Sequence, residues 1–385
     1  MSTTGNAADP ASFRAHFPML DDTVHLASCS QGALSVELTA AMDEFVWSMR
    51  TYGAPWTRWM AQVDQARIRF AHLIGADEDE VAIVSCASDG AYQVASTLDW
   101  GRRPKVVTTD MEFPSVAHVW LAQQPRGAEV VHVPDHDGVV AAEDYAAAVD
   151  ERTALVSVPL VSYRNGARMP VAAAVSRARE LGARVFVDAY QAAGVLPVDV
   201  REIDCDYLVS GALKYLLGVP GLAFLYVRRG TADELAPQLT GWFGRVAPFS
   251  FDPRGLDFPS AARRFETGTP SIPAAYGANA GLRLLEDVDP AVSAAHVHDL
   301  VDELSERLSA AGEVLGSPAD PALRGPQVAL VDDDPDALAG WLGERRIVTS
   351  PRGSLLRLSF HYYNDSSDVD AVASAIADYR AERRT

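Results

Sequence analysis

Seven short apolar runs, separated by segments of helical periodicity, dominate the middle of the chain. The runs occupy residues 81–85, 106–109, 129–133, 154–158, 185–188, 207–210 and 222–227. Each is continuous rather than alternating, which is typical of strands that are buried on both faces of a mainly parallel sheet. The spacers between several of them, such as 91–98, 141–149 and 171–181, carry apolar residues at helical spacing. The pattern predicts an α/β fold with a seven-stranded, mainly parallel sheet.

The two ends of the chain have a different pattern of apolar residues, in which helical spacing predominates. Phe13, Phe17 and Leu20 follow helical spacing and are interpreted as packing residues, and further helices are expected at 36–51 and 61–74. After residue 275, expected helices at 274–287, 291–311, 335–345 and 367–383 accompany short strands at 328–331 and 355–360. We therefore expect an N-terminal arm (1–20), a large domain (21–273) and a small α+β C-terminal domain (274–385).

Composition narrows the class of protein. The 385 residues are 48% hydrophobic and 22% charged, as in an ordinary globular protein, and the formal net charge of −19 disfavours nucleic acid and anionic membranes as partners. No apolar run approaches the roughly 20 residues of a bilayer span, and the N-terminus does not resemble a secretory signal. Cys29, Cys86 and Cys205 show no CxxC spacing. These features predict a cytoplasmic protein.

Lys214 is the most informative residue. Of the 33 basic residues only Lys105 and Lys214 are lysines, which leaves 33 − 2 = 31 arginines. A lysine that persists against this bias is expected where arginine cannot serve, such as an amine that must lose its proton to form an imine. Lys214 follows the run at 207–210, and Asp188 ends the run at 185–188. Neighbouring strand ends of a parallel sheet would bring this acid and this amine to one ligand.

An acid and an imine-forming lysine suit pyridoxal 5'-phosphate, because the acid keeps the pyridine nitrogen protonated and the ring can then withdraw electrons. The surrounding segment resembles the class V aminotransferase family of fold-type I enzymes that use this cofactor. The matching residues are Asp188, Gln191, Gly194, Pro197, Ser210, Lys214, Pro220 and Gly221. One departure is Leu213, where cysteine desulfurases of the family have a histidine. The fold implied is a large domain with seven strands and a smaller C-terminal domain.

The resemblance implies roles for further residues. Ala87 and Ser88, at the start of an expected helix, match the phosphate cradle, and Ser210 matches another phosphate ligand. Phe113, in the segment EFPS, matches a ring that stacks on the pyridine, and Tyr163 matches a turn beside the cofactor. Gln191 matches the residue that hydrogen-bonds the phenolic oxygen.

Two more segments extend the resemblance. RRFETGTPSI (263–272) resembles a loop that reaches the phosphate from the partner subunit, which implies roles for Gly268 and Thr269 and a homodimer with a shared active site. Arg357, in RLSFHYYN, matches the arginine that binds the substrate α-carboxylate. The long loop 241–270 is expected to be functional or interfacial, and its part 241–262 to shape the pocket. The group Trp47, Trp56 and Trp59 is interpreted as core or substrate-entrance lining.

The cofactor admits several reactions, and the fold does not choose among them. A cysteine desulfurase would need a nucleophilic cysteine in the segment 346–354, which has none, and the three cysteines lie elsewhere in the chain. EFPS, GWFG (241–244) and RLSFHYYN resemble an isopenicillin-N-epimerase-like and kynureninase-like branch that acts on amino acids, often in secondary metabolism. We expect α-proton abstraction by Lys214 from the external aldimine, then β-elimination of a cysteine-type conjugate (a C–S lyase). Aminotransfer and epimerisation start identically and stay open.

Hypotheses from other classes are a non-catalytic fold-type I scaffold that binds a partner, and a nucleotide-dependent enzyme on another doubly wound sheet. The joint presence of the acid, the lysine and the arginine argues against the first, and the lack of glycine-rich fingerprints argues against the second. No metal site is expected, since His296 and His298 are two residues apart on a predicted helix and would point to different faces.

Overall fold

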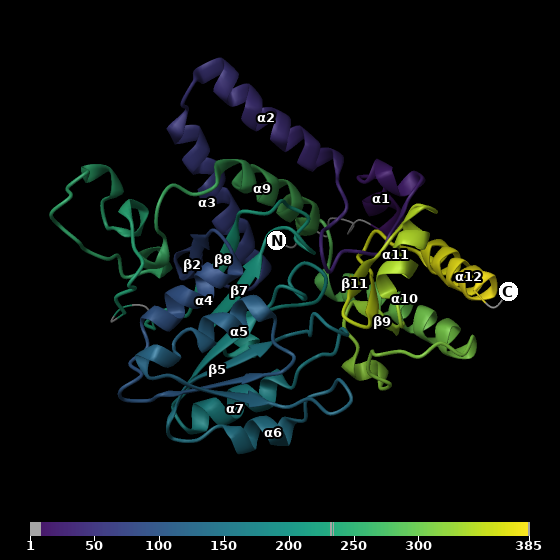
Figure 1. Cartoon of the computed structure of the whole chain (residues 1–385). Helices are drawn as coiled ribbons and strands as arrows, with labels where there is room; N and C mark the ends of the chain where they lie inside the picture. Colours follow the sequence, from purple (N-terminus) through teal and green to yellow (C-terminus); the bar gives the residue numbers. More distant parts are fainter. Residues whose placement is uncertain (1–8, 232, 234, 384–385) are drawn as a thin grey trace, which may run out of the picture.

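A seven-stranded sheet forms the centre of the computed structural model, which describes residues 9–383 apart from residues 232 and 234 (Figure 1). Its strands are, in chain order, β2 (Val81–Val84), β3 (Lys105–Thr109), β4 (Glu129–Val133), β5 (Thr153–Pro159), β6 (Arg184–Asp188), β7 (Tyr207–Gly211) and β8 (Ala223–Val227). Their spatial order is β2-β8-β7-β6-β5-β3-β4, and only β8 runs antiparallel to its neighbours. The predicted mainly parallel seven-stranded sheet is confirmed.

Helices cover both faces of this sheet, which explains why its strands are continuous apolar runs. One face packs against α3 (Trp56–Leu73), α7 (Val171–Glu180) and α9 (Ile272–Glu286). The other face packs against α4 (Ala87–Ser96) and α5 (Pro114–Leu121). The short helices α6 (Ala142–Ala148) and α8 (Val200–Ile203) pack beside α7.

A smaller unit lies beside the large sheet (Figure 1). Its antiparallel sheet has the order β11-β12-β9, made of β9 (Gln327–Val331), β11 (Ser350–Arg352) and β12 (Leu355–Ser359). Three helices pack with it, namely α10 (Pro290–Ala310), α11 (Pro335–Gly343) and α12 (Ser366–Glu382). The expected α+β character of the C-terminal region matches this arrangement.

The N-terminal segment packs on both units. It comprises α1 (Pro10–Arg14) and β1 (Val24–His25), and β1 pairs in parallel with β10 (Ile347–Val348). Arg14 donates to Asp368 at 2.9 Å, and Phe13, Phe17 and Leu20 are buried, which confirms their packing role. The strands β1 and β10 form a separate two-stranded sheet, and α9 packs on α3 and on the large-domain core.

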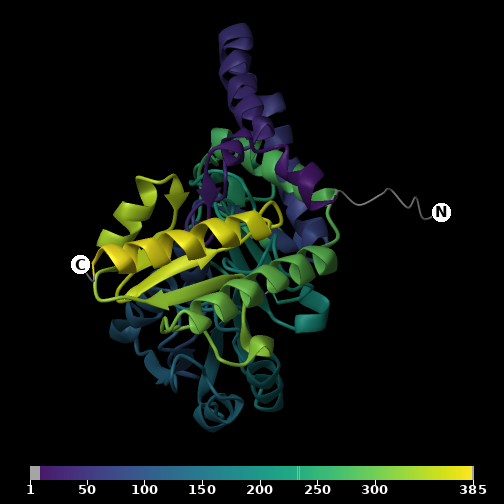
Figure 2. The same ribbon diagram turned by 90° about the vertical axis from the view of Figure 1, so that its right-hand side faces the viewer.

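The helix α2 (Val36–Tyr52) and the long connection between β8 and α9 stand out from the body. Figure 2 shows α2 projecting well beyond the remaining layers. Trp47 and Trp56 are 46% and 39% exposed, so neither is a core residue as one of the sequence-based interpretations had it. The connection contains only short 3-10 turns in its described residues, and its Trp242 contacts Trp56 at 6.4 Å between ring centroids. Within the described residues no helix combines the length and apolarity that a bilayer span requires.

Candidate active site

The carboxyl ends of the central strands place five of the predicted residues around one small cavity. Phe113, Tyr163, Asp188, Gln191 and Lys214 line it together. They come from the segments after β3, β5, β6 and β7, which lie side by side in the sheet, so the expected neighbourhood of acid and amine is observed. Met111, Pro159, Val161 and Tyr190 complete the lining.

Lys214 lies in the turn that joins β7 to β8, and aromatic rings surround its amine. Its Nζ is 4.1 Å from the ring centroid of Tyr190 and 5.3 Å from that of Phe113. Removal from water lowers the pKa of Lys214 to about 8, while the negative charge of Asp188 opposes this shift and the charges of Arg357 and Arg352 add to it. A substantial fraction of the amine is therefore neutral near physiological pH, as a nucleophile or base must be.

The Asp188 carboxyl is buried at the end of β6. Its Oδ1 accepts a hydrogen bond from the backbone N–H of Tyr190 at 2.8 Å. Burial raises the pKa of Asp188, and this hydrogen bond and the positive charge of Lys214 work in the opposite direction. A cationic ring nitrogen placed beside this carboxylate would supply the charge that its buried position lacks.

Glu112 is a second buried acid that the sequence analysis did not single out. Its Oε2 accepts from Ser157 Oγ at 2.9 Å and its Oε1 accepts from the backbone N–H of Phe113 at 2.9 Å. Burial, together with the charge of Asp188, raises the pKa of Glu112 to about 8. Glu112 therefore keeps its proton near neutral pH, and it also fixes the backbone that carries the Phe113 ring. The sequence signal that could have identified Glu112 is its position in the EFPS segment, directly before Phe113.

The remaining groups fit pyridoxal 5'-phosphate. Gln191 donates through Nε2 to the backbone oxygen of Cys29 at 3.1 Å, and its Oε1 is buried without a partner in the described part of the chain. The N-terminus of α4, at Ala87 and Ser88, has no side-chain cap, so its first N–H groups are available to an anion. Ser210 lies buried at the end of β7. Of these residues Gln191 lines the lysine cavity, whereas Ala87, Ser88 and Ser210 lie outside its lining, after β2 and at the end of β7.

Arg357 lies on β12 and points toward the large domain. Its guanidinium donates to the backbone oxygen of Tyr163 at 2.9 Å, to Ser350 Oγ at 2.6 Å and to the Ser350 backbone oxygen at 3.2 Å. Three of its five donors are thereby held in place and two are left for a ligand. The arginine is buried and rigidly oriented beside the lysine cavity, as a carboxylate receptor needs to be.

Gly268 and Thr269 do not line this cavity within the described chain. Both are exposed, in the turn between Phe265 and α9. That turn is anchored by Glu266, which is buried and accepts from Arg67 at 2.7 Å and from the backbone N–H of Ile83 at 3.0 Å.

Two of the three cysteines lie near the site. Cys29 is buried near Lys214, and its charge when ionised raises the pKa of that amine. Cys86 is exposed at the N-cap of α4, near enough to Tyr190 to raise the pKa of its phenol. Tertiary packing thus brings the segments that carry Cys29 and Cys86 to the strand ends, although neither cysteine lies in the segment 346–354.

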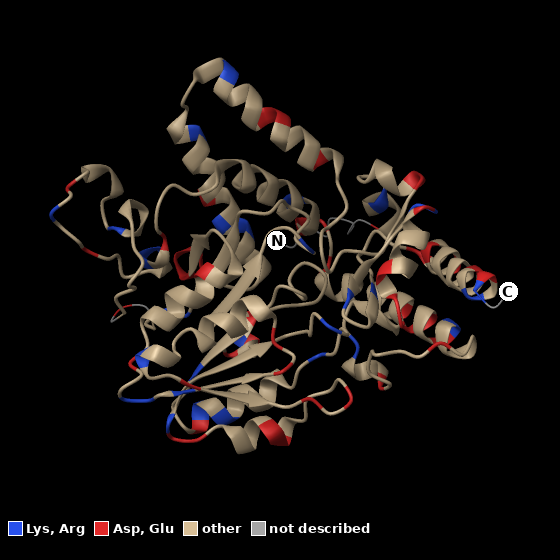
Figure 3. Ribbon diagram, in the orientation of Figure 1, with Lys and Arg blue, Asp and Glu red and all other residues tan. Residues whose placement is uncertain are grey.

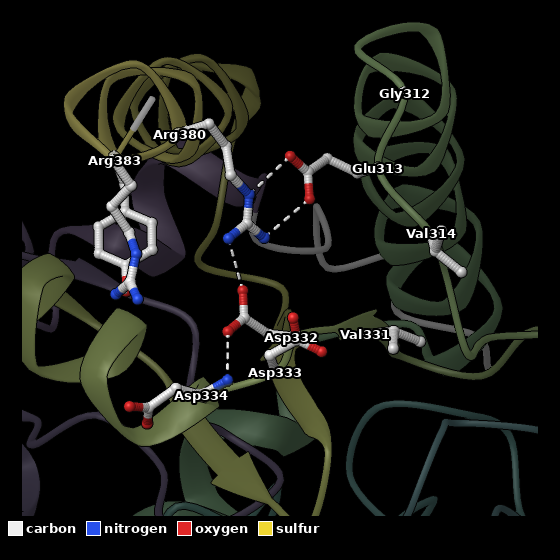
Figure 4. Close-up of a pocket in the computed structure, with 10 residues that line it drawn as sticks. Gly312, Glu313, Val314, Val331, Asp332, Asp333, Asp334, Arg380 and Arg383 are labelled. Carbon is white, nitrogen blue, oxygen red and sulfur yellow. Dashed lines mark hydrogen bonds and ion pairs between the residues drawn. The ribbon is translucent and has the colours of Figure 1, made fainter. Parts of the chain in front are cut away.

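A larger hollow of about 440 Å³ lies on the smaller unit, and a network of ion pairs crosses it. Figure 4 shows that Arg380 bridges Glu313 on one side of this hollow and Asp332 on the other. This network ties α12 to β9 and to the end of α10. Among the described residues no lysine lines the hollow, so it offers no counterpart to the lysine cavity.

Comparisons with known proteins agree with this geometry. The family model described as aminotransferase class-V matches residues 42–372. An uncharacterized aminotransferase, YcbU, of Bacillus subtilis is 38% identical over 368 residues, which cover 96% of this chain and 97% of that protein. A probable cysteine desulfurase of Streptomyces coelicolor is 28% identical over 97% of both chains. A kynureninase of Geobacillus thermodenitrificans is 25% identical over 90% of this chain and 86% of its own.

Solved structures show the same fold. The apo structure of a cysteine desulfurase from Thermococcus onnurineus superposes with a TM-score of 0.87 at 23% identity and covers 98% of this chain and 99% of that one. A mutant of the protein C-DES, with glycine covalently linked to its pyridoxal-phosphate cofactor, superposes with a TM-score of 0.87 at 22% identity, over 95% of this chain and 99% of its own.

Proposed function

Because this chain belongs to the class V aminotransferase family, we propose that it uses pyridoxal 5'-phosphate to act on an amino acid whose α-proton Lys214 removes. The observation that carries this proposal is the single cavity that holds Lys214, Asp188, Gln191 and Phe113, with Arg357 beside it. When bound, the cofactor supplies an electron-withdrawing ring that acidifies the substrate's α C–H bond.

The protein residues have separable tasks. Asp188 provides the negative charge for the ring nitrogen, and Glu112, hydrogen-bonded to the Phe113 backbone, holds the stacking ring. Arg357 holds the α-carboxylate, which determines which bond at the α carbon stands perpendicular to the ring. Lys214, neutral near its pKa of about 8, takes the α-proton and can return it.

We propose β-elimination from a cysteine-type conjugate as the outcome, and aminotransfer as the second candidate because the 38% identical relative is named an aminotransferase. Both begin with the same proton abstraction. The enzyme should release pyruvate from S-substituted cysteines if it is a lyase. Stoichiometric conversion of amino acid to keto acid, with the amino group retained on the enzyme until a second keto acid takes it, would instead identify the aminotransferase.

The test of the proposal compares the wild-type protein with Lys214→Ala after each is mixed with pyridoxal 5'-phosphate. The wild type should develop a visible absorption band that borohydride removes, and the variant should not. Turnover in the variant should fall by at least about 100-fold, as the loss of a general base predicts. A wild-type protein that stays colourless would overturn the proposal.

We further propose that the protein is not a cysteine desulfurase, on the ground that the hairpin 350–359 and the segment before it carry no cysteine. Cys29 and Cys86 make this a sharper test than the sequence alone suggested. L-cysteine should yield no persulfide on the protein. Persulfide formation that disappears in Cys29→Ser or Cys86→Ser would contradict the assignment and name the nucleophile.

A homodimer completes this proposal. It is supported by the exposed position of Gly268 and Thr269 and by the exposed rings of Trp47, Phe249 and Phe251. Exposed apolar surface of this kind is typical of interfaces between chains.

A further inference from the structure

The hairpin of β11 and β12 presents one face to the large domain. Ser350 pairs with Arg357, and Arg352 pairs with Leu355. Directly opposed residues of an antiparallel pair share a face, and so do alternate residues along one strand. Because Arg357 donates to the backbone oxygen of Tyr163, the shared face looks toward the strand ends of the large sheet. Arg352, two residues along from Ser350, belongs to the same face.

Arg352 is held at the end of this hairpin. The connection to β12 is a two-residue turn, and Gly353 adopts a φ of +59°, which a glycine accommodates without strain. The position of the Arg352 backbone is thus set by the same ladder that sets Arg357. The charge of Arg352 reaches the lysine cavity, since it contributes to lowering the pKa of Lys214.

The guanidinium of Arg352 has no partner within the described part of the chain, and it is exposed. Its neighbours at the site differ in this respect, because Arg357 is fixed by three hydrogen bonds and Arg164 is paired with Asp135 at 3.7 Å. The strands β5, β7 and β8 carry no charged residue, and charges gather on the helices and loops (Figure 3). In a chain of net charge −19, an unpaired cation that faces the site is therefore informative.

We propose that Arg352 binds a second anionic group, carried on the side chain of the amino-acid substrate, while Arg357 binds the α-carboxylate. This inference rests on the proposed function. Arg352 lies two residues along β11 from Ser350, which is the cross-strand partner of Arg357, so the two arginines are offset by about 7 Å along the hairpin and also lie on different strands. The two anionic groups must therefore be separated by a chain of several atoms. Glutamate and S-carboxymethylcysteine are substrates of this class, and the second anion can equally be a sulfonate. Arg352 is thus assigned as a specificity-determining residue.

The experiment uses pairs of compounds that have the same shape and differ in one charge. Suitable pairs are L-glutamate with L-glutamine, and S-carboxymethyl-L-cysteine with S-carbamoylmethyl-L-cysteine. Turnover is measured on the cofactor-loaded enzyme, and calorimetry measures the binding of glutarate and of its monoamide, which cannot react. The wild type should favour the charged member of each pair by about tenfold or more in kcat/KM and in Kd.

Arg352→Gln should remove this preference. A loss of about 10- to 100-fold is expected for the charged member, the range for losing a charge-assisted hydrogen bond, and little change for the uncharged one. Arg352→Lys should restore part of the preference. The matched control is Arg102→Gln, which removes an equally exposed arginine that has no side-chain partner among the described residues, in the turn before β3.

The outcomes separate this inference from the proposed function. If the wild type does not distinguish the members of a pair, or if Arg352→Gln leaves the ratio unchanged, the inference is overturned although turnover persists. If the preference for the charged member falls equally in Arg102→Gln, the effect is one of net charge, and the inference about Arg352 is overturned as well. If no amino acid perturbs the cofactor band, the proposed function fails, and the glutarate titration still tests Arg352 by itself.

Discussion

At the scale of single residues, the site depends on titratable side chains whose pKa values are shifted by the surrounding protein. Lys214, Asp188 and Glu112 are coupled, because each is enclosed by the strand ends and each feels the charge of a neighbour. The directions of these pKa shifts predict how cofactor capture and folding stability depend on pH.

Covalent capture of pyridoxal 5'-phosphate by the apoprotein should report the pKa of Lys214. Only the neutral amine reacts, so the capture rate should rise about tenfold per pH unit below pH 8 and level off above it, whereas an ordinary lysine would continue to its usual 10.5. The measurement is the growth of the visible band after mixing between pH 6 and 10. In Asp188→Asn the midpoint should move to lower pH, because the negative charge that favours the ammonium is lost. A rate that climbs steadily to pH 10 would contradict the prediction.

Glu112 should make the protein less stable as pH rises. The folded state holds its proton up to about pH 8, whereas the unfolded chain releases it near 4.5, so between these values the folded state binds more protons and stability falls with increasing pH. Glu112→Gln resembles the protonated acid, so the stability of this variant should fall less steeply with pH between these values. The contribution of Asp188 to the pH dependence should remain. Apoprotein melting temperatures at pH 5 and pH 8.5 provide the measurement, with Tyr145→Phe as a neighbouring control. Parallel curves for the variant and the wild type would count against the assignment.

At the scale of elements, α9 supports the turn that carries Lys214. A Cβ added at Gly281, in the middle of this helix, would lie 2.0 Å from the backbone oxygen of Leu216, two residues after the lysine. Only a glycine allows this close approach between a helix and a turn. The lysine is therefore positioned by a helix that lies about 65 residues further along the chain than the lysine itself.

Gly281→Ala should destabilise the protein by about 1–3 kcal/mol, as overpacking against a backbone does, and should weaken cofactor binding. The matched control is Gly340→Ala on α11, where an added Cβ meets nothing within 4 Å. There the better helix propensity of alanine should raise stability by up to about 1 kcal/mol. Urea denaturation of both variants tests the pair, and an unchanged or improved midpoint in Gly281→Ala would show that α9 can shift.

At the scale of the whole molecule, the proposed dimer makes a prediction about shared active sites. Lys214→Ala removes the base, and Thr269→Trp should block the proposed contact that one subunit makes with the phosphate in its partner. Each variant alone should be inactive by at least about 100-fold. Mixed and reassembled, they should recover activity, because one site of each heterodimer then has an intact lysine and an intact Thr269. If a heterodimer is shown to form and its activity does not recover, Gly268 and Thr269 do not act across subunits.

The sequence by itself determined the central sheet and most of its chemistry. Short continuous apolar runs are typical of strands buried on both faces, so seven runs predicted seven strands, and β2 to β8 lie within a residue or two of them. Lys214 and Asp188 were found because a rare lysine and an acid each follow such a run, and parallel strands bring their ends together.

Only the tertiary structure decided which residues surround these two. Cys29 and Arg352 carry no local pattern that distinguishes a site residue from a surface or core residue, and the EFPS segment marks the position of Glu112 without showing that the acid is buried beside Asp188. Likewise, apolar spacing shows that α9 is a helix but not which core it joins, because a helical stripe fits any apolar partner. Periodicity is a property of one segment, whereas the pKa of a buried group and the partner of an arginine depend on the assembled fold.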